Sequence, residues 1–154
     1  MEPMGVRIVA HRMIASAQSA KGGPLQDAAI LIVEDEAPIA LNLAAAVQRA
    51  GGTVIGPVAS VATAQEAMAD NRVDGALLDI RLRNETSFPV ADVLAVLDIP
   101  FVFVSGLSSA LMPYPHRDRP LFDKPYQVDE VIGVLSRLLK RLARPRQPTS
   151  DVRA

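Results

Sequence analysis

Short apolar stretches alternate along the chain with segments in which apolar residues recur at helical spacing. A β-branched apolar stretch such as 29–33 is typical of a strand buried on both faces of a sheet. Apolar positions about three or four residues apart predict amphipathic helices, with one apolar face. The pattern predicts five strands, at 29–33, 53–58, 76–79, 101–104 and 121–122. It predicts helices at 38–50, 61–70, 90–97 and 128–143.

The alternation of strands and helices indicates the fold class. It implies an α/β fold in which helices cover both faces of a parallel sheet. We therefore expect a doubly wound, five-stranded parallel sheet of the flavodoxin-like type. Pro113, Pro115 and Pro120 lie between the last two expected strands. Since proline breaks the interior of a helix, the helix in this connection should be short or irregular.

The chain divides into an N-terminal arm at 1–27, a domain at 28–143 and a C-terminal tail at 144–154. The arm is expected to be partly helical or disordered. Its apolar stripe at helical spacing predicts a short amphipathic helix: Val6, Val9, Met13 and Ala17. The Lys-Gly-Gly-Pro segment at 21–24 would end that helix. The alternatives are an arm without structure, or translation that starts at Met13.

Composition excludes several classes of function. The chain has 154 residues and no cysteine, which fits one domain in a reducing compartment, and a cytoplasmic location is expected. A membrane-spanning helix needs about 20 apolar residues in a row, and none is present. Acidic residues outnumber basic ones in the body of the chain, and only 4% of residues are aromatic. A nucleic-acid-binding surface is therefore not expected.

Polar side chains follow four of the five expected strands. Glu34 and Asp35 come after the first strand, Asp79 after the third, Ser105 after the fourth and Lys124 after the fifth. In open α/β sheets the carboxyl ends of the strands form the ligand site. Each residue alone has an ordinary explanation as a helix cap, a turn residue or a solvated charge. Their joint placement predicts that they gather at one edge of the sheet.

The chemistry of this set points to phosphoryl transfer. Clustered carboxylates repel one another unless a cation lies among them. Oxygen ligands without histidine or cysteine select a hard ion, most simply Mg²⁺. A carboxylate can then attack phosphorus to form an aspartyl phosphate. The amine and the hydroxyl would neutralise and hydrogen-bond the phosphoryl oxygens.

Four segments in this order resemble the receiver domain of two-component response regulators. They are ILIVEDE at 30–36, GALLDIRL at 75–82, VFVSG at 102–106 and DKPY at 123–126. The resemblance covers about residues 28–143. It implies the five-stranded doubly wound fold, and it implies that the chain accepts a phosphoryl group and is not an enzyme beyond its own phosphorylation and dephosphorylation.

The same resemblance assigns roles to individual residues. Asp79 would be the phospho-acceptor and a metal ligand. Asp35 would bind Mg²⁺ directly, Glu34 would bind it through water, and the backbone carbonyl of Arg81 would complete the protein ligands. Ser105 would be the switch hydroxyl. Two further implications are that Lys124 contacts the phosphoryl group and that the Lys124-Pro125 bond is cis.

The chain also departs from the common receiver pattern. Leu121 occupies the position of the usual switch aromatic, three residues before the lysine. The segments SFPVAD at 87–92 and PFVF at 100–103 resemble an atypical subgroup known by its FAT GUY motif, although VSGL at 104–107 replaces the usual ATGY. Members of this subgroup tend to pair with sensor histidine kinases of the HWE type in alphaproteobacteria, which suggests such a kinase as partner.

The function expected from the sequence is that of a single-domain phospho-accepting receiver. It would signal through an unknown downstream protein or act as a phosphate sink, and a homodimer is left open. One alternative is a pseudo-receiver that binds a partner without being phosphorylated. Another is a phosphatase of the haloacid-dehalogenase type. That class needs a second acid two residues after the nucleophile, where this chain has Arg81.

Overall fold

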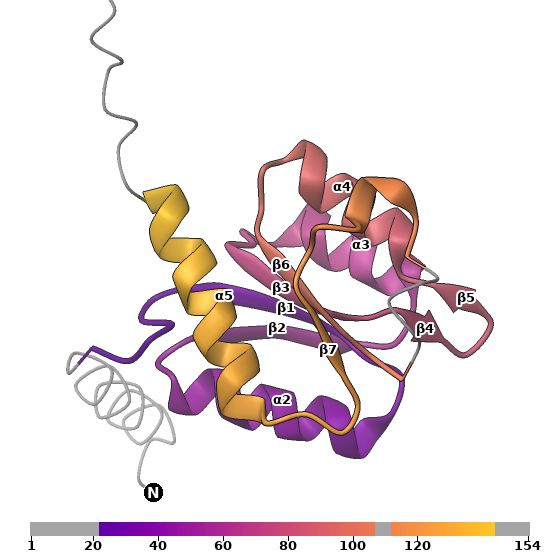
Figure 1. The fold of residues 1–154 in the computed structure, drawn as a ribbon. Helices are drawn as coiled ribbons and strands as arrows, with labels where there is room; N and C mark the ends of the chain where they lie inside the picture. Colours follow the sequence, from indigo (N-terminus) through magenta and orange to yellow (C-terminus); the bar gives the residue numbers. More distant parts are fainter. Residues whose placement is uncertain (1–21, 107–111, 144–154) are drawn as a thin grey trace, which may run out of the picture.

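The computed structural model describes residues 22–106 and 112–143 (Figure 1). Their core is a five-stranded sheet with the order β2-β1-β3-β6-β7, and all paired strands in it run parallel. The strands of this sheet are β1 (Ala29–Val33), β2 (Thr53–Val58), β3 (Gly75–Asp79), β6 (Phe101–Ser105) and β7 (Leu121–Asp123). The helices are α2 (Ala37–Arg49), α3 (Val61–Asp70), α4 (Phe88–Val96), η2 (Tyr114–His116) and α5 (Val128–Ala143). The expected doubly wound fold is confirmed.

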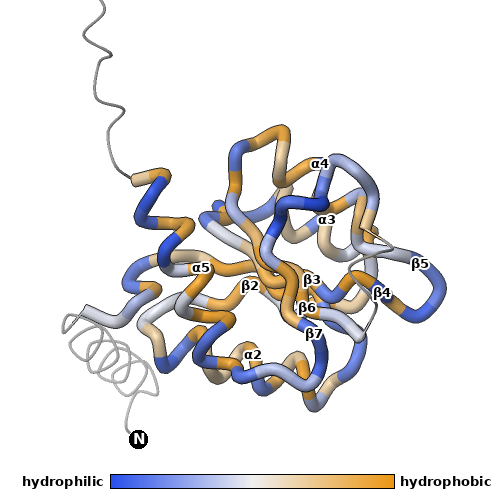
Figure 2. Tube along the Cα trace, in the orientation of Figure 1, coloured by the Kyte–Doolittle hydropathy of each residue, from blue (hydrophilic) through white to orange (hydrophobic). Residues whose placement is uncertain are grey.

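Helices cover both faces of the sheet, with α2 and α5 on one face and α3 and α4 on the other (Figure 1). Neighbouring side chains in β1 enter opposite layers: Leu31 packs in the α3–α4 layer and Ile32 in the α2–α5 layer. This alternation follows from the two-residue repeat of a strand. It explains why β1, β3 and β6 have almost wholly apolar sequences. Figure 2 shows the strands as the hydrophobic centre of the molecule.

Local signals in the sequence set the ends of the helices. Ser60 caps α3 through a capping box with Thr63, which satisfies backbone N–H groups at the start of the helix. α2 ends before Gly51, whose φ of 88° is a left-handed conformation that glycine adopts without strain. The third helix begins at Phe88, two residues earlier than expected. Pro89 was expected to precede that helix, but it lies in its first turn, where proline is well tolerated.

The structure contains a second sheet that was not predicted from the sequence. It is a two-stranded antiparallel hairpin of β4 (Arg81–Leu82) and β5 (Glu85–Thr86), directly after β3. The side chain of Glu85 accepts a hydrogen bond from the backbone N–H of Val61 at 2.9 Å, so the hairpin contacts the start of α3. Two-residue strands are too short to produce a periodic pattern, so the hairpin could not be read from the sequence.

The segment just before β1 packs against the domain. Leu25 is 1% exposed, and the hydroxyl of Ser136 in α5 donates a hydrogen bond to the carbonyl oxygen of Pro24 at 2.8 Å. The end of the expected arm is therefore held on α5. The helix expected earlier in the arm and the tail at 144–154 lie outside the described residues. No helix of the described part has both the length and the apolar character to cross a membrane.

The connection from β6 to β7 has little regular structure among its described residues. It contains the short 3-10 helix η2, in line with the helix-breaking prolines, while residues 107–111 lie outside the described part. The side chain of His116 packs this connection against the sheet. Its ring is 2% exposed, stacks on Phe88, and lies edge-on to Phe101 and Phe103. Its Nε2 lies 2.7 Å from Oδ1 of Asp92 in α4.

We expect His116→Ala to reduce the free energy of unfolding by about 2–4 kcal/mol, as large-to-small changes in a core do. Asp92 is 66% exposed, so Asp92→Ala should cost about 1 kcal/mol or less. Urea unfolding of the two variants checks both values. Equal losses would show that the polar pair, and not ring packing, holds the connection in place.

Candidate functional site

The residues that follow the strands lie at one edge of the sheet. Glu34 and Asp35 follow β1, Asp79 ends β3, Ser105 ends β6 and Lys124 follows β7. Because β3 lies between β1 and β6 in a parallel sheet, the carboxyl ends of all three strands meet. β7 brings the lysine from beyond β6. The structure thus brings together the side chains that the sequence analysis grouped.

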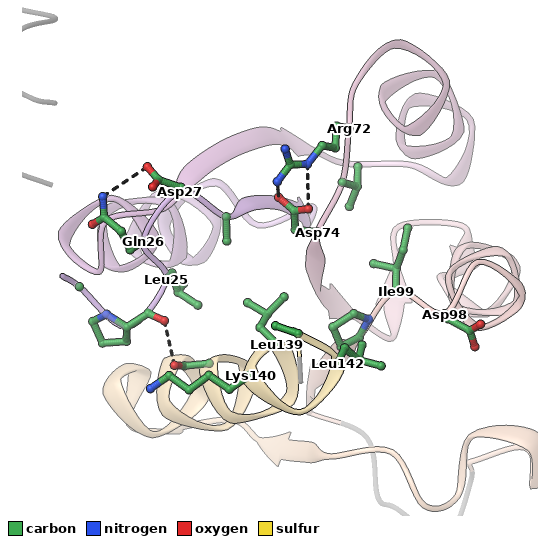
Figure 3. Close-up of a pocket in the computed structure, with 17 residues that line it drawn as sticks. Leu25, Gln26, Asp27, Arg72, Asp74, Asp98, Ile99, Leu139, Lys140 and Leu142 are labelled. Atoms are coloured by element: carbon green, nitrogen blue, oxygen red, sulfur yellow. Dashed lines mark hydrogen bonds and ion pairs between the residues drawn. The ribbon is translucent and has the colours of Figure 1, made fainter. Parts of the chain in front are cut away.

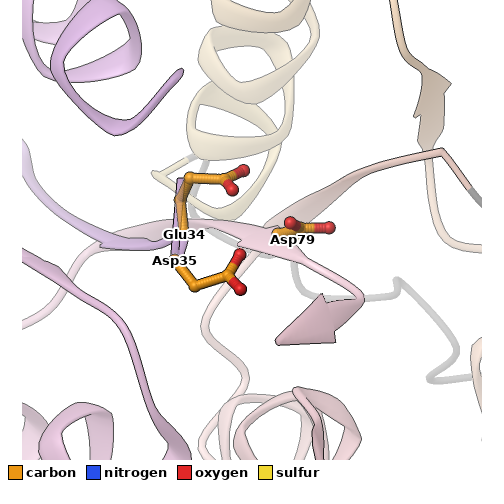
Figure 4. A group of neighbouring side chains, drawn as sticks. All are labelled: Glu34, Asp35 and Asp79. Carbon is orange, nitrogen blue, oxygen red and sulfur yellow. The ribbon is translucent and has the colours of Figure 1, made fainter. Parts of the chain in front are cut away.

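Three carboxylates form the centre of this edge. Each of Glu34, Asp35 and Asp79 offers an oxygen atom that lies within 4.8 Å of the others (Figure 4). Glu34 and Asp79 are each 3% exposed. One oxygen of Glu34 accepts a hydrogen bond from the backbone N–H of Glu36 at 3.1 Å. This bond holds the short segment between β1 and α2 in place.

Lys124 places its ammonium group among these acids. Its Nζ lies 3.1 Å from Oδ2 of Asp79 and 3.3 Å from Oε2 of Glu34. It lies 3.8 Å from Oε1 of Glu36 as well. The peptide bond that follows, Lys124-Pro125, is cis, as the resemblance implied. The lysine is therefore the cation of the cluster among the described residues.

Burial controls the electrostatics of the cluster. Burial, together with the nearby charge of Asp79 and a hydrogen bond with it, raises the pKa of Glu34 to about 7, against a backbone hydrogen bond and the charge of Lys124, which lower it. Burial also raises the pKa of Asp79, against the hydrogen bonds from Glu34 and Lys124 that lower it. Burial alone would lower the pKa of Lys124, but its hydrogen bond and charge contact with Asp79 raise it. The raised pKa of both buried acids means that their charged forms are disfavoured as long as no further cation lies among them.

The cluster fits a hard divalent cation. It offers carboxylate oxygens only, without histidine or cysteine, which is the donor set that Mg²⁺ prefers. A cation placed among three such oxygens would relieve their mutual repulsion. The position of Asp35, partly exposed beside two buried acids, leaves one side of the cluster accessible to solvent.

A cavity of about 370 Å³ opens at this edge. Its lining residues are Asp35, Glu36, Asp79, Arg81, Leu82, Arg83, Ser105, Gly106 and Lys124. Ser105, which is 1% exposed, and Arg81 thus reach the same space as the acids. Arg83 also lines the cavity and was missed by the sequence analysis. Only the β4–β5 hairpin brings it back over the site, and that hairpin gave no signal in the sequence.

Comparison with known proteins places this site in a family. No family model matches the chain. The chain is 43% identical to SdrG from Sphingomonas melonis Fr1, over 75% of this chain and 98% of that one, with a TM-score of 0.64. It is 30% identical to a response regulator receiver protein from Sinorhizobium medicae WSM419, over 75% of this chain and 97% of that one, with a TM-score of 0.64.

The phyllosphere-induced regulator PhyR from Methylorubrum extorquens is 33% identical over 121 residues, which make up 71% of this chain. The chain matches 43% of the length of PhyR, less than half of that relative. A parallel five-stranded sheet with acids, a hydroxyl and a lysine at one edge is the arrangement of a receiver domain. The matches to SdrG and to the Sinorhizobium receiver protein extend over nearly the whole of those two chains. The chain belongs to the response regulator receiver domains of two-component signalling.

Proposed function

We propose that this receiver accepts a phosphoryl group on Asp79 and uses it to signal. The observation that supports this most strongly is the geometry around Asp79, which has an acid cluster within 4.8 Å and a lysine nitrogen at 3.1 Å. An oxygen of Asp79 would attack phosphorus. The P–N bond of a phosphohistidine donor would break as the P–O bond forms, and its electron pair would leave with the nitrogen.

Each neighbour has a part in this step. Asp35, Asp79 and the backbone carbonyl of Arg81 would hold Mg²⁺, and Glu34 would hold it through water. When bound, Mg²⁺ supplies positive charge to the phosphoryl oxygens. The ammonium group of Lys124 would move from the carboxylate of Asp79 to a phosphoryl oxygen. The hydroxyl of Ser105 would donate a hydrogen bond to another phosphoryl oxygen. This change of partners provides two states between which phosphorylation shifts the population.

The partners belong to the same proposal. The donor would be a sensor histidine kinase, and the resemblance to the FAT GUY subgroup suggests the HWE type. The phosphorylated chain would contact a downstream protein in the cytoplasm or serve as a phosphate sink.

The test is labelling by acetyl phosphate with Mg²⁺, followed by mass spectrometry of the intact protein. We expect the mass of one phosphoryl group to be added to the parent chain and none to Asp79→Asn. Asp123→Asn, an exposed aspartate at the end of β7, is the matched control and should label like the parent. Absence of labelling in a folded parent chain would contradict the proposal and favour an unphosphorylated interaction module.

A long-lived phosphorylated form is a further expectation. Hydrolysis needs a side chain that holds or activates water near the phosphoryl group. Arg81, two residues after Asp79, is a cation and lines the cavity, but it is no general base. We expect the label to persist well beyond seconds after removal of the donor in the presence of Mg²⁺. A decay within seconds, followed by intact mass, would contradict this expectation.

A further inference from the structure

A second cavity lies at the end of the sheet opposite the acid cluster. Its volume is about 630 Å³, within the range of about 300–1,000 Å³ typical of binding pockets. It is a groove between the segment before β1, the loops that lead into β3 and β6, and the C-terminal half of α5 (Figure 3). Its apolar lining includes Leu25, Val73, Ile99, Pro100, Leu139 and Leu142.

Apolar surface around this groove is unusually exposed. Leu142, on its wall, is 57% exposed. Leu97 and Val96, which directly precede groove residue Asp98, are 57% and 83% exposed. These are three of the five large hydrophobic residues that are strongly exposed in the described part of the chain. Exposed apolar side chains beside an apolar groove indicate an interaction surface.

The rim of the groove carries a negative excess. Arg72 and Asp74 neutralise one another through an ion pair at 2.9 Å. Asp27 and Asp98 also line the groove, both exposed and without an ion pair among the described residues, and Lys140 is the one other charged residue of the lining. The occupant should therefore combine an apolar stripe with net positive charge.

The chain enters the described structure at the mouth of this groove. Gly23 and Pro24 line it, and the hydrogen bond from Ser136 holds Pro24 on α5. Residues 1–21 are thus attached within two positions of the groove. A short link of this kind gives residues 1–21 an effective concentration on the order of mM at the groove, so that even a weak binding site is occupied.

The sequence of that segment matches the groove. It carries the apolar stripe of Val6, Val9, Met13 and Ala17, together with Arg7, Arg12 and Lys21 against a single acid, Glu2. A helix over 6–17 would be about 18 Å long, and residues 18–21 could span about 13 Å, enough to reverse the chain. A helix this short is marginal alone in water and needs a surface to pack on. The tail at 144–154 carries only Val152 as a large apolar residue and fits less well.

We propose that residues 1–21 dock in this groove of their own chain, with the stripe of the 6–17 helix on the apolar wall and its arginines toward Asp27 and Asp98. The docked segment would cover apolar surface at the end of the sheet away from the phosphoryl-accepting edge, and the partner is thus intramolecular.

The absence of cysteine permits a direct test in the full chain. Met13→Cys combined with Leu142→Cys should be linked by a short bismaleimide within one monomer, at a yield that does not change on dilution. Met13→Cys combined with Tyr114→Cys, at a more exposed site that does not line the groove, is the control and should give a several-fold lower yield. Equal yields in both pairs would overturn the proposal, and so would crosslinked dimers that grow with concentration, which indicate a second copy in the groove.

A matched pair of alanines tests the stripe itself. Ala17 lies on the apolar stripe and Ala15 on the opposite side of the same helix. Introduced into the Met13–Leu142 cysteine pair, Ala17→Asp should lower the crosslinked fraction several-fold, whereas Ala15→Asp should leave it unchanged. Equal effects of the two aspartates would show that the stripe does not make the contact.

Discussion

Replacing Lys124 with methionine is expected to slow labelling by acetyl phosphate by about 10²–10³ fold, the effect typical of removing one donor that stabilises a developing negative charge. Methionine keeps the length and the apolar stem of the side chain but removes the ammonium group. That group lies 3.1 Å from Oδ2 of Asp79, the residue that would accept phosphorus. The rate of mass gain at fixed donor and Mg²⁺ concentrations measures the loss.

Two controls separate this effect from loss of the fold. Lys140→Met makes the same chemical change on the exposed surface of α5 and should label at the parental rate. The affinity of Lys124→Met for Mg²⁺ should stay the same or rise, because a positive charge leaves the cluster. Parental labelling of Lys124→Met would contradict the assigned role, and loss of both labelling and Mg²⁺ affinity would indicate that the cluster itself had collapsed.

Asp35→Asn is expected to weaken Mg²⁺ binding on the order of 100-fold. Two unit charges about 4 Å apart contribute about 4 kcal/mol at an effective dielectric constant of 20, and a divalent ion about twice that, of which the neutral amide oxygen and water restore the larger part. Labelling should then need a correspondingly higher Mg²⁺ concentration, and it should vanish for the parent chain in EDTA. The Mg²⁺ concentration that gives half-maximal labelling is the quantity to measure.

Asp70→Asn, at the exposed end of α3, is the matched control for that substitution and should not change the Mg²⁺ requirement. Labelling of the parent chain that continues in EDTA would contradict a metal-dependent site. An unchanged Mg²⁺ requirement in Asp35→Asn would remove Asp35 from the ligand set.

The main elements could be predicted because strong local signals coincide with the final packing. β1 reads as a strand because all its side chains enter one of two apolar layers, and α3 begins where Ser60 can cap it. The site was predictable for a different reason. In a parallel sheet the carboxyl ends of the strands share one edge, so knowing the strands places Asp79 and Lys124 together without any side-chain coordinates.

What the sequence did not reveal depends on contacts between distant segments. His116 stands in a stretch rich in proline and arginine, and its burial arises from phenylalanines of α4 and β6. Leu25 was placed in an arm, but it packs in the layer formed by α2 and α5. Arg83 reaches the cavity only through a hairpin of two-residue strands. None of these residues carries a periodic or spacing signal of its own.

The location of the phosphoryl group tests the central claim most directly. After labelling with acetyl phosphate and Mg²⁺, borohydride reduces an aspartyl phosphate to homoserine, which peptide mass spectrometry locates in the chain. We expect homoserine at position 79 and at no other aspartate. Homoserine at position 35, or a stable label on a serine or lysine, would contradict it.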